Sequence, residues 1–136
     1  MRNVKTISAG LLLSGLLLGM NLSAQTEADK HLEKILLSIR NADIETLSTY
    51  LNDMVELTVP GSEGTYSNTQ AKFLLKDFFK KHPPLNIQVK HEGSSNKGSR
   101  FAICHYKHKS GKYRLYYLIK EKNNKYLIHI LRFENI

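Results

Sequence analysis

The sequence of 136 residues contains one cysteine, no tryptophan and three prolines. With Cys104 as the only cysteine, an intrachain disulfide is excluded, so the fold must be held by its apolar core without covalent cross-links. Cys104 lies within an alternating run, Phe101–Tyr106. This pattern predicts that Cys104 is a small buried hydrophobe and not a reactive thiol.

Motifs for catalysis and metal binding are also missing. The sequence has no Gly-x-Ser-x-Gly turn for a nucleophilic serine. His105 and His108, on a predicted strand and its turn, face opposite sides and cannot chelate the same metal ion. Three other histidines have no cysteine or acid at ligand spacing, namely His31, His82 and His91. We therefore expect no metal, no cofactor and no catalytic residue.

The N-terminal segment has the pattern of a secretory signal. Arg2 and Lys5 precede an apolar run over residues 7–20, and Ala24 supplies the small residue expected before a cleavage site. A membrane-spanning helix needs about 20 predominantly apolar residues, and this run is shorter. The sequence thus predicts a cleaved signal peptide, residues 1–24, and export of a single domain, residues 25–136, to the periplasm or beyond.

Basic residues outnumber acidic ones, with 20 Lys and Arg against 12 Asp and Glu and a formal net charge of +8. The late part of the chain carries most of this excess, at Lys107, Lys109, Lys112, Arg114, Lys120, Lys122 and Lys125. Export removes nucleic acid from reach, so we expect no nucleic-acid partner. Two interpretations remain: the lysines protect hairpin turns and sheet edges from aggregation, or they bind an anionic glycan or phospholipid surface.

Apolar spacing predicts three helices in the first half of the domain. The first, opened near Thr26, has a buried face formed by Leu32, Ile35, Leu36 and Ile39. Asp43 caps the second, whose apolar residues are Ile44, Leu47 and Leu51. The clearest local signal is the capping box Ser67–Gln70, which opens a third helix with an apolar face of Ala71, Leu74, Leu75, Phe78 and Phe79.

Strands are predicted over residues 54–59 and, after Pro83 and Pro84, around residues 85–89 and over 100–107, 113–120 and 125–134. Residues 61–66 are predicted as a loop or a short hairpin return. The links between the last four strands are short, which demands antiparallel neighbours.

The last two strands are apolar on both faces. In the first, Tyr113, Leu115, Tyr117 and Ile119 point one way and Tyr116 and Leu118 the other. In the second, simple alternation sets Leu127, His129, Leu131 and Phe133 against Tyr126, Ile128 and Ile130. Helices can cover only one face of such a sheet, so the other is expected to meet a ligand, a partner or a second copy. We expect a twofold homodimer through that face.

This order of elements resembles that of the nuclear transport factor 2-like superfamily. Several short segments of the sequence also resemble those of a family of exported bacterial proteins of unknown function within that superfamily. The resemblance rests on residues 66–72, 77–79, 91–95, 98–103 and 125–133. It implies an α+β fold in which three N-terminal helices pack on a curved, mostly antiparallel sheet to form a cone. Because this superfamily includes enzymes, small-molecule binders and interaction modules, the resemblance implies a fold and no activity.

Superfamily members that isomerise steroids use an aspartate base at the end of the first strand. Here residues 57–60, Leu-Thr-Val-Pro, occupy that region, and the nearest carboxylates are Glu56 and Glu63. Alternation turns Glu56 toward solvent, and Glu63 lies in a Gly-rich loop. Neither has an evident partner, which weighs against isomerase chemistry.

Three hypotheses about function follow. The first is a non-enzymatic domain of the cell envelope that binds a small molecule, a glycan or a protein through the cone or the uncovered sheet face. The second is an isomerase, dehydratase or hydrolase with a histidine and a tyrosine lining the cone, and the third is electrostatic attachment to an anionic surface. His129 is expected to be a core residue satisfied by one hydrogen bond. If instead its face lines an open cone, His129 with Tyr117 or Tyr66 would anchor a ligand. A filled cone with an apolar outer face would favour a protein partner.

Overall fold

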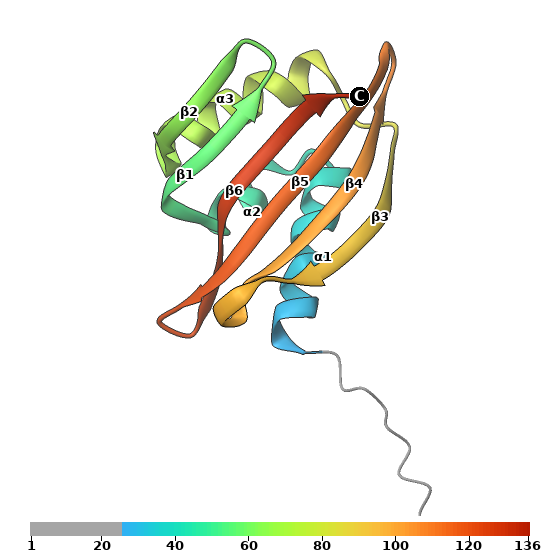
Figure 1. The fold of residues 1–136 in the computed structure, drawn as a ribbon. Helices are drawn as coiled ribbons and strands as arrows, with labels where there is room; N and C mark the ends of the chain where they lie inside the picture. The colour runs from blue at the N-terminus through green and yellow to red at the C-terminus, as the bar shows by residue number, and fades with distance from the viewer. Residues whose placement is uncertain (1–25) are drawn as a thin grey trace, which may run out of the picture.

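Three helices lie on one side of a six-stranded sheet in the computed structural model, which describes residues 26–136 (Figure 1). The predicted signal peptide lies outside the described residues. The helices are α1 (Glu27–Arg40), α2 (Ile44–Thr49) and α3 (Asn68–Lys81). The strands are β1 (Leu51–Val59), β2 (Ser62–Ser67), β3 (Asn86–Ser94), β4 (Arg100–His108), β5 (Gly111–Lys122) and β6 (Lys125–Asn135), with a short 3-10 turn, η1 (Asn96–Gly98), before β4.

The sheet order is β2-β1-β6-β5-β4-β3, and every neighbouring pair is antiparallel except β1 and β6. This arrangement confirms the predicted α+β class with a mostly antiparallel sheet. None of the described helices is long and apolar enough to cross a membrane.

The helix starts are capped as the sequence predicts. Thr26 Oγ1 accepts a hydrogen bond from the backbone N–H of Asp29, and Asp43 accepts one from the N–H of Thr46. At α3 the capping box is complete: Gln70 N donates to Ser67 Oγ at 3.2 Å, and Ser67 N donates to Gln70 Oε1 at 3.4 Å. These bonds satisfy donors that the first helical turn leaves unpaired.

One strand start differs from the sequence prediction, and of the two alternatives for residues 61–66 the hairpin return is the one observed. Leu51 begins β1 and does not belong to α2, so the first strand starts three residues earlier than Met54. Residues 62–67 form β2, an edge strand that returns along β1 after a tight turn at Pro60 and Gly61. Gly61 has a φ of +83°, a conformation that glycine adopts without strain.

The space between the helices and the inner face of the sheet is filled by side chains. The largest fully buried side chains in this space include those of Tyr106, Tyr117 and Phe133. The Tyr117 hydroxyl donates to the backbone carbonyl of Leu32 at 3.1 Å, which fastens α1 to β5. A small cleft of about 50 Å³ between the β1–β2 turn and α3 falls well below the roughly 300 Å³ at which ligand sites begin.

A bulge in β6 changes which face its residues occupy. Ile128 pairs with the buried Ile119, whereas Ile130 pairs with Leu118 on the opposite face, so His129 is the extra residue between them. The predicted grouping of His129 with Leu131 is therefore wrong, because the inner face takes Ile128 together with Leu131. A bulge inserts one unpaired residue and so breaks the two-residue alternation on which the prediction rested.

Candidate binding surface

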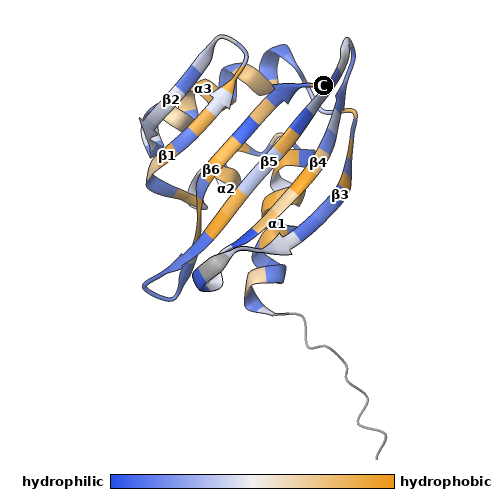
Figure 2. Cartoon of the chain, in the orientation of Figure 1, coloured by the Kyte–Doolittle hydropathy of each residue, from blue (hydrophilic) through white to orange (hydrophobic). Residues whose placement is uncertain are grey.

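Apolar residues cross the middle of the outer sheet face, the one turned away from the three helices (Figure 1). Strand pairing aligns them in two rows, since Ile103 pairs with Tyr116 and Leu118 pairs with both Phe101 and Ile130. We call these five residues the outer band. Leu118 is only 7% exposed although none of the described helices covers it, and it is flanked by its strand partners Phe101 and Ile130. Figure 2 shows that hydrophobic residues of either face are concentrated in the middle of β4, β5 and β6 and hydrophilic residues toward the turns.

Gly93 allows the outer band to extend onto β3. A Cβ atom at Gly93 would lie 2.7 Å from Cζ of Phe101, closer than side chains tolerate. The missing side chain therefore leaves room for the Phe101 ring to lie across β3 beside His91, with ring centroids 5.6 Å apart. On its other side the Phe101 ring lies 6.1 Å from that of Tyr116.

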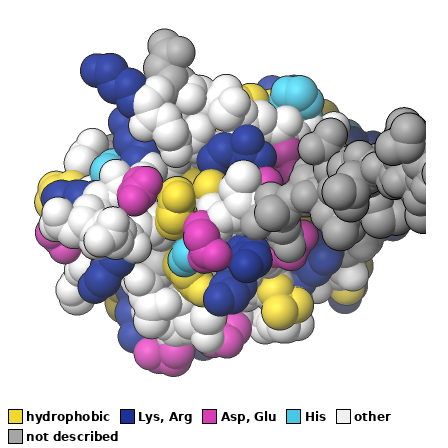
Figure 3. All heavy atoms as spheres, turned by 90° about the horizontal axis from the view of Figure 1, so that it is seen from below, with side chains coloured by type: hydrophobic (Ala, Val, Ile, Leu, Met, Phe, Trp, Pro, Cys, Tyr) yellow, Lys and Arg dark blue, Asp and Glu magenta, His cyan; other side chains and the backbone are white. Residues whose placement is uncertain are grey.

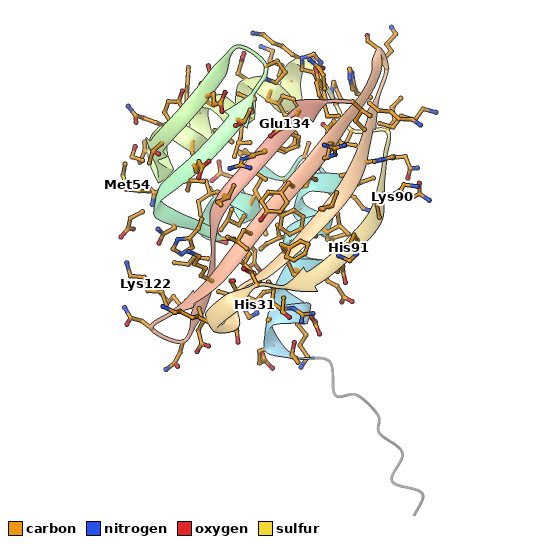
Figure 4. All side chains as sticks on the ribbon, in the orientation of Figure 1. His31, Met54, Lys90, His91, Lys122 and Glu134 are labelled. Atoms are coloured by element: carbon orange, nitrogen blue, oxygen red, sulfur yellow. The ribbon has the colours of Figure 1, made fainter. Side chains whose placement is uncertain are left out.

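Positive charges border the outer band at both ends of the strands. Near the β4–β5 turn, Lys107 pairs with Lys112, and Arg114 continues the same outward set on β5. Near the β5–β6 turn the exposed cations are Lys120, Lys122 and Lys125, the last of which pairs with Lys122. Figure 4 shows Lys122 at that end and Lys90 on β3 at the far margin of the sheet.

Few acids balance these cations on the outer face. Glu134 pairs across β5–β6 with Arg114. Glu63 on β2 pairs with the outward Thr58 and so lies on this face too. Glu56 accepts a hydrogen bond from Arg132 at 2.6 Å, and Arg132 lies over the Tyr116 ring at 5.7 Å. At the end of the molecule where α1 begins, by contrast, acidic side chains are interspersed with basic ones (Figure 3). The excess of positive charge thus lies beside the outer band.

The three predicted ligand anchors, His129, Tyr117 and Tyr66, do not come together. Tyr117 is fully buried, and burial raises the pKa of its hydroxyl far above the ordinary value. Tyr66 on β2 lines a groove with residues of α3, to which neither His129 nor Tyr117 contributes. His129 lies at the β6 bulge, where burial and then the nearby Lys120 and Lys122 lower its pKa. Its Nε2 atom is shielded from solvent and has no hydrogen-bond partner among the described residues.

A cluster of histidine and tyrosine rings that the sequence did not single out lies around His108. His108 is 7% exposed and stacks on Tyr113, with ring centroids 4.6 Å apart. The His82 ring lies 5.0 Å away, and the Tyr106 hydroxyl donates to the His82 backbone carbonyl. Burial, followed by His82, lowers the pKa of His108. Cys104 and Tyr106 point inward on β4, and because every second residue of a strand shares a face, the same pattern predicts that His108 points inward too.

The remaining candidates for catalysis are placed unfavourably. Glu56 is committed to Arg132 on the open face, and Glu63 is exposed on β2. Cys104 is fully buried, and burial raises the pKa of its thiol to about 11, so the nucleophilic thiolate is scarce at neutral pH. Within residues 26–136 no group of three or more His, Cys, Asp or Glu side chains could hold a metal ion.

Comparisons with known proteins identify relatives but no activity. The profile of a family described as a domain of unknown function (DUF4783) matches residues 32–134. A DUF4783 family protein from Bacteroides ovatus is 26% identical, with 76% of this chain and 93% of that chain covered and a TM-score of 0.70. A DUF4783 family protein from Bacteroides uniformis is 24% identical, with coverage of 76% and 95% and a TM-score of 0.71.

A more distant structure has the same fold. An NTF-2 like protein of unknown function from Burkholderia xenovorans is 12% identical, with 79% of this chain and 82% of that chain covered and a TM-score of 0.58. The resemblance to the nuclear transport factor 2-like fold is thereby confirmed. No curated protein is significantly similar to this chain.

Proposed function

The chain belongs to the DUF4783 family, and we propose that it is an exported, non-enzymatic binding domain whose outer sheet face binds an acidic protein in the cell envelope. The filled interior is the observation that carries this proposal. Tyr106, Tyr117 and Phe133 occupy the space in which other cone-shaped folds could admit a substrate. The outer band, in contrast, is apolar and lies on the face that no described helix covers.

The composition of the outer band, half-buried apolar residues bordered by charged ones, favours a protein partner. Soluble monomers rarely leave a contiguous apolar patch uncovered, and such a patch rimmed by polar residues is typical of a protein–protein contact. Tyr116 is the natural anchor, since tyrosine combines a large apolar ring with a polar tip and is enriched at interfaces. The Arg132 guanidinium over this ring adds a donor at the centre of the surface.

The charges around the outer band favour an acidic partner over a second copy. In a twofold pair of facing sheets, the symmetry axis lies in the plane between them. If the axis runs along the strands, each end of one outer face lies against the same end of the outer face of its copy. If the axis runs across the strands, each end lies against the opposite end of the copy. Both ends are basic, with Lys112 and Arg114 at one and Lys120 and Lys122 at the other. Either arrangement brings like charges together, whereas carboxylates on a partner would attract both ends.

Export rests on the sequence of residues 1–24, with its basic start, short apolar run and Ala24. N-terminal sequencing of the protein from the organism that encodes it tests this part. We expect the chain to begin at Gln25 in the periplasmic or extracellular fraction. Retention of Met1 in the membrane fraction would contradict it.

Site-specific cross-linking in that organism tests the binding surface. A photoreactive amino acid at position 116 should cross-link one partner, and the same amino acid at position 37 on α1, where Leu37 is 56% exposed, should not. The cross-linked protein, once purified, should bind the mature chain more weakly at higher salt and after Ile103→Glu.

The alternatives are outcomes of the same experiment. Cross-linking of the mature chain to itself, with a dimer in sedimentation equilibrium, would replace the acidic partner by the homodimer that the sequence predicts. Binding to phosphatidylglycerol vesicles without a cross-linked protein would instead favour an anionic lipid surface.

A further inference from the structure

We propose that the free edge of β2, with the groove between β2 and α3, binds an extended peptide that has alternating apolar residues and a carboxylate. This site is separate from the outer band. The peptide would add a seventh strand to the sheet and place every second side chain in the groove.

The two edges of the sheet are treated differently by the fold. β3, at one edge, has a register shift between Val89 and His91, which inserts the exposed Lys90. Arg40 from α1 also donates to the backbone carbonyl of Ile87 on β3 at 3.0 Å. Bulges, edge lysines and side chains bound to edge carbonyls all hinder the addition of another strand. β2, at the opposite edge, pairs with β1 without a register shift over six residue pairs.

The backbone of β2 offers hydrogen-bonding groups to such a strand. Val59 and Ser62 flank a two-residue turn, so they form a hydrogen-bonded pair, and such pairs alternate along an antiparallel ladder. Gly64 and Tyr66 therefore bond to β1, whereas the N–H and C=O groups of Glu63 and Thr65 point away from it. Between them these two residues provide two donors and two acceptors in the spacing that an extended peptide requires.

The groove beside this edge suits apolar side chains. It has a volume of about 450 Å³, within the range of known ligand sites. Tyr66 and Leu74 form part of it, and Phe73 is 72% exposed, the most exposed large apolar residue of the described chain. The Tyr66 ring lies beside Gly64, whose Cβ position is 3.6 Å from it, so the ring lies along the strand.

Positive charge continues beyond the groove along α3. Lys76 and Lys80 lie one and two turns after Phe73 on the exposed side of the helix. Neither takes part in any of the ion pairs found among the described residues. A carboxylate on the bound peptide would be attracted to them, which is why we include one in the peptide's description.

A random peptide library displayed on phage, selected against the mature chain, tests the proposal. Enriched peptides should alternate apolar and polar residues and carry an acid. The strongest, synthesised with a fluorophore, should bind at least about tenfold more weakly to Phe73→Ala and to Thr65→Pro than to the wild type. Proline removes the outward N–H of Thr65 but is tolerated on an edge strand whose N–H faces solvent. Leu37→Ala, which truncates an exposed residue on α1, is the matched control and should bind normally.

Amide hydrogen exchange gives a second readout that does not depend on a variant. On peptide binding, exchange of the Glu63 and Thr65 amides should slow strongly, whereas the Gly64 and Tyr66 amides are already protected by β1. Enriched peptides without alternation, unchanged exchange at Glu63 and Thr65, or binding lost through Ile103→Glu and not through Phe73→Ala would overturn the proposal.

Discussion

Replacement of Leu75 by alanine should destabilise the protein more than any change to the cap or the exposed face of the same helix. Leu75 is fully buried where α3 packs on the sheet, so its removal leaves a cavity in a dense core. Truncation of a buried leucine costs about 2–5 kcal/mol. A domain of this size is stable by roughly 5–15 kcal/mol in total, so Leu75→Ala should remain folded but with a clearly lowered urea midpoint.

Two matched variants on α3 calibrate this prediction. Ser67→Ala removes one bond of the capping box and should cost about 1 kcal/mol. Phe73→Ala truncates a side chain that is 72% exposed and should change the free energy of unfolding by less than about 0.5 kcal/mol. Urea unfolding followed by far-UV circular dichroism gives the three values at a common slope. If Phe73→Ala were as costly as Leu75→Ala, the assignment of the buried face would be refuted.

Three further outcomes are expected. Burial lowers the pKa of His108 in the folded protein, so the unfolded chain takes up a proton at higher pH than the folded one does. The free energy of unfolding should therefore fall as the pH drops below about 6.5. A His108→Gln variant should show a shallower fall in melting temperature over the same pH range. Cys104 should resist a thiol reagent at pH 8 until denaturant unfolds the chain, and rapid labelling without denaturant would contradict its burial. Asp29→Asn should lower the free energy of unfolding, measured with heat or urea, by about 1–3 kcal/mol, because it leaves the part-buried Arg100 without its carboxylate. Glu27→Gln, which removes an exposed ion pair, should lower it by less than about 1 kcal/mol.

Features set by neighbouring residues could be predicted from the sequence. The caps at Thr26, Asp43 and Ser67 act over three residues, so the pattern that predicts them is also the pattern that forms them. The inward and outward sets of β5 follow from alternation in the same way: Tyr117 is buried, and Tyr116 lies on the outer face.

Features that depend on distant partners could not be predicted. The parallel pairing of β1 with β6 joins residues more than 70 positions apart, and no turn marks it. At the bulge at His129, β6 shifts register against β5 on one side and, close by, against β1 on the other, so its place depends on strands far away in the sequence. For this reason His129 does not lie on the face on which simple alternation places it.

The two proposed binding sites can be tested independently because β1 lies between β2 and the strands of the outer band. Between the outer band and β2, β1 turns Glu56 and Thr58 outward beyond the exposed Met54, and Glu56 is held by Arg132. The groove lined by Tyr66 opens toward α3, on the other side of the sheet from Tyr116. Ile103→Glu should therefore leave peptide binding at β2 unchanged, and Phe73→Ala should leave the cross-link from position 116 intact. If either variant abolished both, one extended partner would have to cover the sheet face and its edge together.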